Sequence, residues 1–281
     1  MLSTNIETPL ISATELAEIL NEPHVKVFDV RGRWGQNNQD AYSEYLDEHI
    51  EGAHFLDWLQ YFVEADVPIN QASVAGKEKA QADFSALGIN QNDLVVVYDD
   101  YHHMLAGRVW WEMSYWGFQN VKLLNGGFSY WKANHLPMST SVKTLGRGTF
   151  LVSEQPEYRV TTNEVSQRSE DVLLVDARGK AGFDGKITDP ESGHIPGAIN
   201  IPFLSLIDKE TGLFKSHDEI NSIIKESIDD IEHKIIISSC GSGYSGTIFL
   251  IALKLIGINS PLYDGSISEW KMMKNPLVQT K

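Results

Sequence analysis

Cysteine is nearly absent from this sequence: one residue, Cys240, occurs among 281. A single cysteine excludes any disulfide within the chain, so the fold does not depend on a disulfide framework. The histidines are dispersed and lack the spacing of zinc ligands. The sequence therefore predicts no structural zinc site.

Long hydrophobic runs are also missing. The longest, residues 248–253, ends at Lys254 and is far shorter than the roughly 20 residues that span a bilayer. Residues 1–7 have no basic stretch followed by an apolar one, so they predict no secretory signal. We expect a cytoplasmic protein that has no membrane partner.

Basic residues are in deficit, with 23 Lys and Arg against 38 Asp and Glu. The net charge of −15 and the absence of a Lys/Arg-rich cluster argue against a surface that follows a phosphate backbone. No Gly-Lys-Ser/Thr follows the glycines of residues 241–247, which excludes a P-loop. Nucleic acid is not an expected partner.

The chain repeats itself at an offset of about 140 to 147 residues. Four segments recur in the same order: residues 27–31 (VFDVR) as 174–178 (LVDAR), 49–53 (HIEGA) as 194–198 (HIPGA), 94–99 (LVVVYD) as 235–240 (IIISSC), and 124–132 (LNGGFSYWK) as 263–271 (YDGSISEWK). The same order of segments at a similar offset indicates a duplicated domain. At 281 residues, two domains are also the better expectation from length.

Short β-branched segments alternate with helical ones in each half, for example residues 95–98, then 108–116, then 121–124. This alternation predicts an α/β fold in which a parallel sheet carries helices on both faces. We expect a first domain over residues 1–140, a linker over 141–158 and a second domain over 159–281.

Cys240 stands where a predicted strand gives way to a loop of glycine and serine and then to a helix. Backbone N–H groups and the positive end of a helix dipole at such a place favour the thiolate, which is the reactive form. A buried cysteine used only for packing is the alternative, but packing does not require so many glycines in the following loop. The predicted anion-binding loop comprises Gly241, Ser242, Gly243, Tyr244, Ser245 and Gly246.

The first repeat has Asp99 where the second has Cys240. A carboxylate cannot act as a sulfur nucleophile, so the first domain is expected to be catalytically silent. Arg31 and Arg178 each follow an aspartate by two positions in both repeats, and His49 and His194 recur in equivalent turns. Their presence in a silent domain favours structural roles for all four.

Together these motifs resemble the tandem-domain rhodaneses, the thiosulfate and 3-mercaptopyruvate sulfurtransferases. The resemblance covers nearly the whole chain and includes residues 108–111 (RVWW), 125–128 (NGGF) and 264–266 (DGS) besides the repeated segments. It implies two rhodanese-like domains, with the nucleophile in the second, and no metal or other cofactor.

The resemblance also implies an activity: transfer of a sulfane sulfur from a small anionic donor, thiosulfate or 3-mercaptopyruvate, through a Cys240 persulfide. A thiol or cyanide would accept the sulfur, and a thioredoxin-like protein is one candidate thiol. The Cys-Gly-Ser-Gly sequence beginning at Cys240 is similar to the mercaptopyruvate branch, which assigns Ser242 to substrate contact or proton transfer.

The sequence departs from this family at two functional positions. Gly182 stands where the second domain usually supplies an arginine for the donor anion, and Leu59 stands where the first usually supplies an aspartate, with Asp57 two residues earlier. A glycine cannot provide the planar fork of an arginine. The predicted substitutes for that arginine are Lys180, Lys186 and Arg33.

Two other functions stay open from the sequence. The chain could be a persulfide-carrying or protein-binding module that turns over little small donor. A cysteine-dependent phosphatase would need an arginine at the sixth position after the cysteine, where this chain has Gly246.

Overall fold

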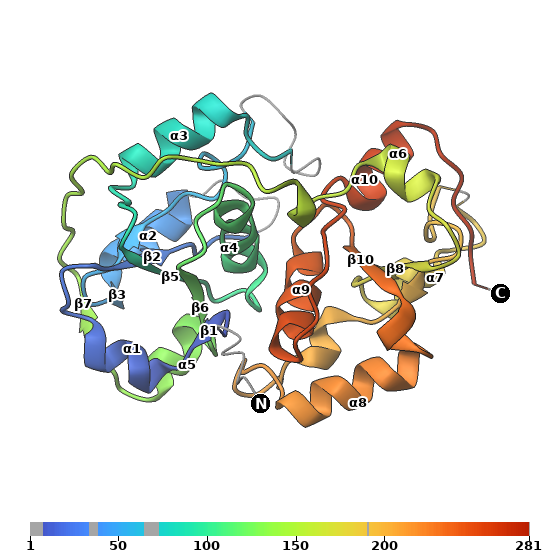
Figure 1. Cartoon of the computed structure of the whole chain (residues 1–281). Helices are drawn as coiled ribbons and strands as arrows, with labels where there is room; N and C mark the ends of the chain where they lie inside the picture. Colours follow the sequence, from blue (N-terminus) through green and yellow to red (C-terminus); the bar gives the residue numbers. More distant parts are fainter. Residues whose placement is uncertain (1–7, 34–38, 65–72, 190, 281) are drawn as a thin grey trace, which may run out of the picture.

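The computed structural model describes residues 8–33, 39–64, 73–189 and 191–280, which form two α/β units side by side (Figure 1). The first unit contains β1 (Leu10–Ile11), α1 (Ala13–Ile19), β2 (Val25–Asp29), α2 (Gln39–Asp47), β3 (His49–Ile50), β4 (His54–Phe55), α3 (Lys77–Ala86), β5 (Leu94–Tyr98), α4 (Met104–Tyr115), β6 (Val121–Leu124), α5 (Gly127–Ala133) and β7 (Met138–Ser139).

The second unit begins after the 3₁₀ turn η2 (Pro156–Tyr158). It contains α6 (Thr162–Ser166), β8 (Val172–Asp176), α7 (Lys180–Asp184), β9 (Ile199–Asn200), η3 (Phe203–Leu206), α8 (His217–Ser227), η4 (Ile231–His233), β10 (Ile235–Ser239), α9 (Ser245–Leu255) and α10 (Ser266–Met272). The described chain between β7 and η2 has no helix or strand.

The sheet of the first unit has the strand order β1-β6-β5-β2-β4, and every pairing is parallel. Its central register aligns Val25 with Leu94 and Val95 with Val121. A separate antiparallel pair joins β3 to β7.

The second unit repeats this topology with shorter pairings. Its sheet has the order β10-β8-β9, and both pairings are parallel. Leu262 forms one parallel bridge with Ser238 of β10 and another with Arg159. These two bridges extend the sheet beyond β10 in the same order as the β5-β6-β1 side of the first sheet. An antiparallel bridge between His194 and Val278 corresponds to the β3–β7 pair. The structure thus confirms the duplication predicted from the sequence.

Alternate residues of β5 face two different cores, which explains why this strand is apolar throughout. Val95 and Val97 belong to one core with Phe84 of α3, whereas Val96 and Tyr98 belong to another with α1 and α5. Parallel strands buried on both faces have this continuous apolar pattern. The prediction of helices on both faces of the sheet is confirmed.

The two units share one hydrophobic core along α4 and α9, which lie against each other at the centre of Figure 1. The approach is close at Gly107, where a Cβ would lie 2.6 Å from Thr247 Oγ1. The shared core places the amino-terminal end of α4 beside the amino-terminal end of α9. This juxtaposition brings residues of the first unit to the cysteine loop of the second.

Helices that begin the two repeats start with the same local signal. Ser12 caps α1 and Thr161 caps α6, each with a glutamate three residues later that returns a hydrogen bond to the cap residue. Such reciprocal caps satisfy amide groups that a helix end otherwise leaves unpaired.

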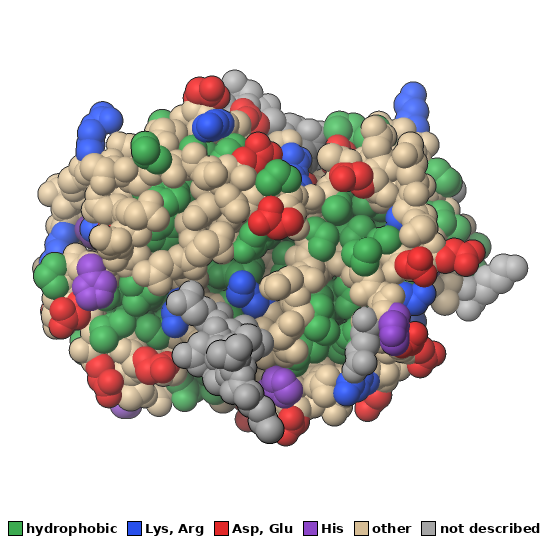
Figure 2. Space-filling view, in the orientation of Figure 1, with side chains coloured by type: hydrophobic (Ala, Val, Ile, Leu, Met, Phe, Trp, Pro, Cys, Tyr) green, Lys and Arg blue, Asp and Glu red, His purple; other side chains and the backbone are tan. Residues whose placement is uncertain are grey.

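Across the described residues, no helix has the length and apolarity to cross a bilayer. On the face shown in Figure 2, acidic and basic side chains are scattered among hydrophobic ones, and the basic side chains are spread over the surface.

Candidate active site

Cys240 directly follows β10 and lies at the carboxyl edge of its sheet. Its Sγ accepts a hydrogen bond from the backbone N–H of Gly243 at 3.1 Å. The residue is only 1% exposed, yet it lines a cavity of about 370 Å³. The thiol is therefore recessed in a cavity wall, oriented by an amide of the predicted loop, and is not sealed in the core.

Both units form this cavity. Its wall consists of Tyr101, Met104 and Leu105 from the first unit and Arg178, Cys240, Gly241, Ser242, Tyr244, Ser245 and Ser268 from the second. Trp58 of the first unit packs edge-on against Tyr244, with ring centroids 5.3 Å apart. A ligand in the cavity would touch both repeats, although only one carries the thiol.

Ser266 anchors the backbone at the cysteine and was missed in the sequence analysis. Its Oγ accepts the Cys240 N–H at 3.0 Å, donates to the Tyr263 carbonyl at 2.7 Å and lies 3.9 Å from Sγ. Ser266 has a left-handed backbone, with φ of 50°, as does its repeat equivalent Gly127. The replacement of Gly127 in the first repeat by a serine in the second is the sequence signal that could have identified Ser266.

Arg108 of α4 reaches from the first unit to the cysteine loop. It is fully buried, pairs with Glu112 at 2.7 Å and approaches Asp264 at 3.8 Å, while Arg159 bonds the other oxygen of Asp264 at 2.8 Å. Burial raises the pKa of Glu112 to about 7, although the Arg108 charge acts in the opposite direction. The approach of Arg108 to Asp264 thus links the two units beside the loop.

Asp99 occupies the place of Cys240 in the first repeat, and its carboxylate is saturated by its own loop. Oδ1 accepts the N–H groups of Tyr101 and His103, and Oδ2 accepts those of Leu105 and Ala106, all between 2.8 and 2.9 Å. An internal anion thus takes the amides that could otherwise bind a ligand. This geometry gives a physical reason for the catalytic silence predicted for the first repeat.

A loop of the second unit covers the same edge of the first sheet. His103 Nε2 donates to the Gly212 carbonyl at 2.7 Å, and the Phe214 N–H bonds Asn125 Oδ1 at 2.9 Å. Burial lowers the pKa of His103, which favours its neutral form. Each unit therefore contributes to the carboxyl edge of the other.

The structure brings most of the predicted anion-binding loop to the cavity. Ser242 and Ser245 line it, and neither side chain has a hydrogen-bond partner among the described residues. Gly243 supplies the amide to Sγ without lining the cavity. Gly246 instead allows close packing, because a Cβ there would lie 2.9 Å from the Leu262 side chain.

The three basic residues predicted as substitutes for the missing arginine do not line the cavity. Lys180 pairs with Asp184 on an exposed helix face, and Arg33 pairs with Asp100 at 2.6 Å. Lys186 is exposed and forms an isolated bridge with Asp189.

Asp57 and Leu59 also lie outside the cavity wall. Asp57 Oδ1 accepts the Leu59 N–H at 3.0 Å, and its Oδ2 accepts the Gln60 side-chain amide. These two hydrogen bonds of the Asp57 carboxylate stabilise the turn that follows it.

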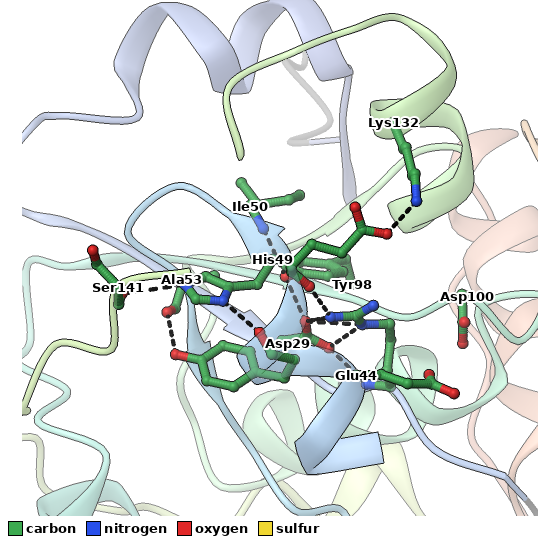
Figure 3. Close-up of polar contacts among 12 residues, drawn as sticks. Asp29, Glu44, His49, Ile50, Ala53, Tyr98, Asp100, Lys132 and Ser141 are labelled. Atoms are coloured by element: carbon green, nitrogen blue, oxygen red, sulfur yellow. Dashed lines mark hydrogen bonds and ion pairs between the residues drawn. The ribbon is translucent and has the colours of Figure 1, made fainter. Parts of the chain in front are cut away.

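Figure 3 shows the polar contacts around Asp29 and Tyr98 in the first unit, where Asp29 pairs with Arg31. Arg31 Nη2 lies 2.8 Å from Asp29 Oδ2, and the Tyr98 hydroxyl donates to the same oxygen at 2.7 Å. Burial raises the pKa of Asp29, while Arg31 and Tyr98 act against that rise. His49 beside these contacts donates from Nδ1 to the Tyr45 carbonyl, which is the structural role predicted for it.

Among the residues that the structure describes, no group of three or more His, Cys, Asp or Glu side chains could hold a metal. A second cavity, of about 440 Å³, lies farther along the α4–α9 seam and is lined by Trp110, Tyr158, Leu250 and Lys254 among others. The only cysteine of the chain lies in the wall of the other cavity, so the cavity beside Cys240 is the better candidate active site.

Comparison with known proteins agrees with the family resemblance found in the sequence. The model of the rhodanese-like domain matches residues 12–134 and again residues 161–273. The 3-mercaptopyruvate sulfurtransferase of Escherichia coli is 32% identical over 271 residues, which cover 94% of this chain and 95% of that protein. The thiosulfate/3-mercaptopyruvate sulfurtransferase 2 of Arabidopsis thaliana is 31% identical, covering 99% and 88%.

A solved structure is similar over the same length. The crystal structure of SseA from Escherichia coli, described as a 3-mercaptopyruvate sulfotransferase, superposes with a TM-score of 0.82. It is 31% identical and covers 92% of this chain and 98% of its own. The similarity thus includes both units.

Proposed function

This chain belongs to the rhodanese-like family as a tandem-domain sulfurtransferase, and from that premise we propose that the Cys240 thiolate is its sulfur carrier. The observation that carries the proposal is the 3.1 Å bond from the Gly243 N–H to Sγ at the wall of the cavity. A preoriented amide stabilises negative charge on sulfur without rearranging during the reaction.

In the first step, the thiolate attacks the transferable sulfur of the donor and a new S–S bond forms. With thiosulfate, the S–S bond of the donor breaks and its electron pair leaves on sulfite. With 3-mercaptopyruvate, the C–S bond breaks, its electron pair passes to carbon, and the resulting pyruvate enolate takes up a proton. Ser242 is our candidate for contact with the donor or for that proton transfer, because this residue lines the cavity.

In the second step, an acceptor thiolate or cyanide attacks the outer sulfur of the persulfide. The S–S bond of the persulfide breaks, and its electron pair returns to Cys240 as the thiolate. Backbone amides of the loop formed by Gly241, Gly243, Tyr244, Ser245 and Gly246 would stabilise the persulfide anion between the two steps. This two-step route predicts ping-pong kinetics.

We propose thiosulfate and 3-mercaptopyruvate as donors because the relatives carry these compounds in their names. A thioredoxin-like dithiol is our candidate acceptor, with cyanide as the assay acceptor. The lone cysteine, which excludes an internal disulfide, supports a cytoplasmic location. We retain the domain bounds 1–140 and 159–281, with 141–158 as linker.

Intact-protein mass spectrometry after incubation with each donor tests the proposal. We expect a mass gain of one sulfur atom that disappears on addition of cyanide or dithiothreitol. Because Cys240 is the only cysteine, Cys240→Ser is a matched control that should gain no sulfur. Sulfur loading of Cys240→Ser, or no loading of the unsubstituted protein by either donor, would refute the assignment.

A further inference from the structure

Arg178 and Arg31 are equivalent positions of the two repeats and share most of their contacts. Each side chain bonds the aspartate two residues before it, with Nη2 to Oδ2 distances of 2.6 Å for Arg178 and 2.8 Å for Arg31. Each Nη2 also donates to a backbone carbonyl, that of Gly193 or Glu48. Both arginines therefore hold the end of a central strand.

The two arginines differ in their exposure and in the groups that surround the guanidinium. Arg31 is closed off, because its side chain is 3% exposed and its guanidinium carbon lies 3.9 Å from the ring centroid of Phe128. The equivalent of Phe128 in the second repeat is Ile267, which offers no aromatic face. The Arg178 side chain is 19% exposed and forms part of the cavity wall with Cys240.

The outer nitrogen of Arg178 is available for a ligand. The Arg178 side chain makes its hydrogen bonds to the described residues through Nε and Nη2. The outer nitrogen, Nη1, takes part in none of these bonds. A guanidinium can donate five hydrogen bonds. Nη1 therefore offers donors beyond those used by Asp176 and Gly193.

Gly182 keeps the approach to Nη1 open. A Cβ at position 182 would lie 3.8 Å from Nη1, so a longer side chain there would compete for the same space. Gly182 is exposed on α7, and it is the position where the family resemblance leads one to expect an arginine. Within the described part of the chain, Arg178 is the one cationic side chain in the cavity wall.

We propose that Arg178 Nη1 binds an anionic oxygen of the sulfur donor, a sulfonate-type or carboxylate oxygen, beside Cys240. This inference deepens the proposed function and rests on it for the identity of the ligand. Asp176 accepts hydrogen bonds from Nε and Nη2 of Arg178. The donor would therefore bind to Nη1 alone and would not form a bidentate contact with two guanidinium nitrogens. Recognition through one nitrogen accommodates both tetrahedral and planar anions, and it binds either less tightly than a bidentate contact does.

Gly182→Asp and Gly182→Asn form a matched pair that leaves Arg178 in place. The carboxylate of Gly182→Asp would lie within reach of Nη1 and occupy it, whereas the amide of Gly182→Asn has the same size without the charge. Because the position is exposed and a Cβ there would lie 3.8 Å from the Arg178 side chain, neither change introduces a clash. The readout is alkylation of Cys240 by anionic iodoacetate and by neutral iodoacetamide.

We expect Gly182→Asp to lower the ratio of the iodoacetate rate to the iodoacetamide rate by about tenfold, since a hydrogen bond to a charged group is lost. Gly182→Asn should change this ratio less than twofold. In turnover assays, Gly182→Asp should raise the KM for thiosulfate by a similar factor with kcat nearly unchanged. An equal effect of the two variants, or no effect of Gly182→Asp, would overturn the inference.

Arg178→Lys, with Arg31→Lys as its repeat-matched control, provides an independent check. Both changes weaken an aspartate pair, but only Arg178→Lys should lower the iodoacetate to iodoacetamide ratio. An equal loss in both would mean that Arg178 acts only through the fold. Alkylation needs no sulfur transfer, so a failure of the anion site and a failure of the sulfurtransferase assignment give different results.

Discussion

Arg108 Nη1 lies 3.3 Å from the carbonyl oxygen of Gly243, so a buried arginine of the first unit donates to the loop that holds the thiol. The N–H of the same glycine donates to Cys240 Sγ. Gly243 has φ of +80°, and a Cβ there would lie 2.5 Å from the Asp264 carbonyl oxygen and 2.7 Å from Arg108 Nη1. The silent repeat therefore helps to set the conformation of the active loop.

Arg108→Lys should slow alkylation of Cys240 by iodoacetamide between about threefold and tenfold, since an anchoring hydrogen bond worth about 1 kcal/mol is lost. A lysine ammonium keeps the charge beside Glu112 but lacks the second nitrogen that reaches Gly243. The rate is measured on the folded protein by mass spectrometry.

Arg31→Lys is the control for Arg108→Lys. Arg31 is also a buried arginine paired with a carboxylate, but its contacts stay within the first unit. Both variants should unfold at lower temperature, and only Arg108→Lys should alter the thiol. Identical alkylation rates in the two variants would show that Arg108 has no influence on the loop beyond stability.

Glu112→Gln should change the pH dependence of stability. The pKa of Glu112 is raised from 4.5 to about 7 by burial, with Arg108, Asp264 and Asp83 as the other charges that act on it. The folded protein therefore binds the proton more tightly than the unfolded chain does. The stabilising effect of the protonated carboxyl is complete below pH 4.5 and is lost as the pH rises to about 7, with a slope of at most about 1.4 kcal/mol per pH unit.

Thermal unfolding of both proteins from pH 5 to pH 8 measures this effect. The Tm of the unsubstituted protein minus that of Glu112→Gln should fall between pH 5 and pH 7 and then become constant. A difference that increases with pH would mean that the Arg108 charge, and not burial, governs this carboxyl.

Ser266→Gly and Ser266→Ala separate backbone strain from the hydrogen bond to Cys240. Both remove the acceptor of the Cys240 N–H, which costs about 1–3 kcal/mol for a buried donor. Only alanine keeps the cost of the left-handed backbone, about 1 kcal/mol. Urea unfolding should therefore rank the unsubstituted protein above Ser266→Gly, and Ser266→Gly above Ser266→Ala. The reverse order of the two variants would contradict this account.

Asp99→Asn should destabilise the first unit by about 3 kcal/mol or more, because the amide nitrogen cannot accept the N–H groups of Leu105 and Ala106. Asp100→Asn, which weakens the partly exposed pair with Arg33, should cost less than about 1 kcal/mol. Denaturant unfolding compares the two variants. Equal effects would show that the carboxylate at position 99 is not needed to satisfy its loop.

The sequence was a good guide to the position of Cys240 and a poor guide to the cation beside it. Strand periodicity and a glycine-rich loop are local features, so β10, the loop and α9 could be predicted. Lys180, Lys186 and Arg33 were predicted as substitutes for the missing arginine. They pair or face solvent elsewhere, whereas Arg178, predicted to be structural, both holds Asp176 and reaches the cavity.

Ser266 and Arg108 illustrate why the remainder of the site could not be predicted. Ser266 lies 26 residues from Cys240, and Arg108 lies 135 residues from Gly243. Neither spacing has a periodicity that a sequence pattern could reveal. Their roles depend on how α10 and α4 pack against the cysteine loop.

The order of residues alone determined that the chain is duplicated, that each copy alternates strands with helices, and that one copy has a thiol where the other has a carboxylate. These properties follow from local hydrophobic periodicity and from chemical identity at matched positions. Only the tertiary structure decided which side chains surround the thiol, because α4 packs on α9 and brings one repeat to the active edge of the other. Contacts across that seam depend on packing between distant segments, which local patterns do not encode.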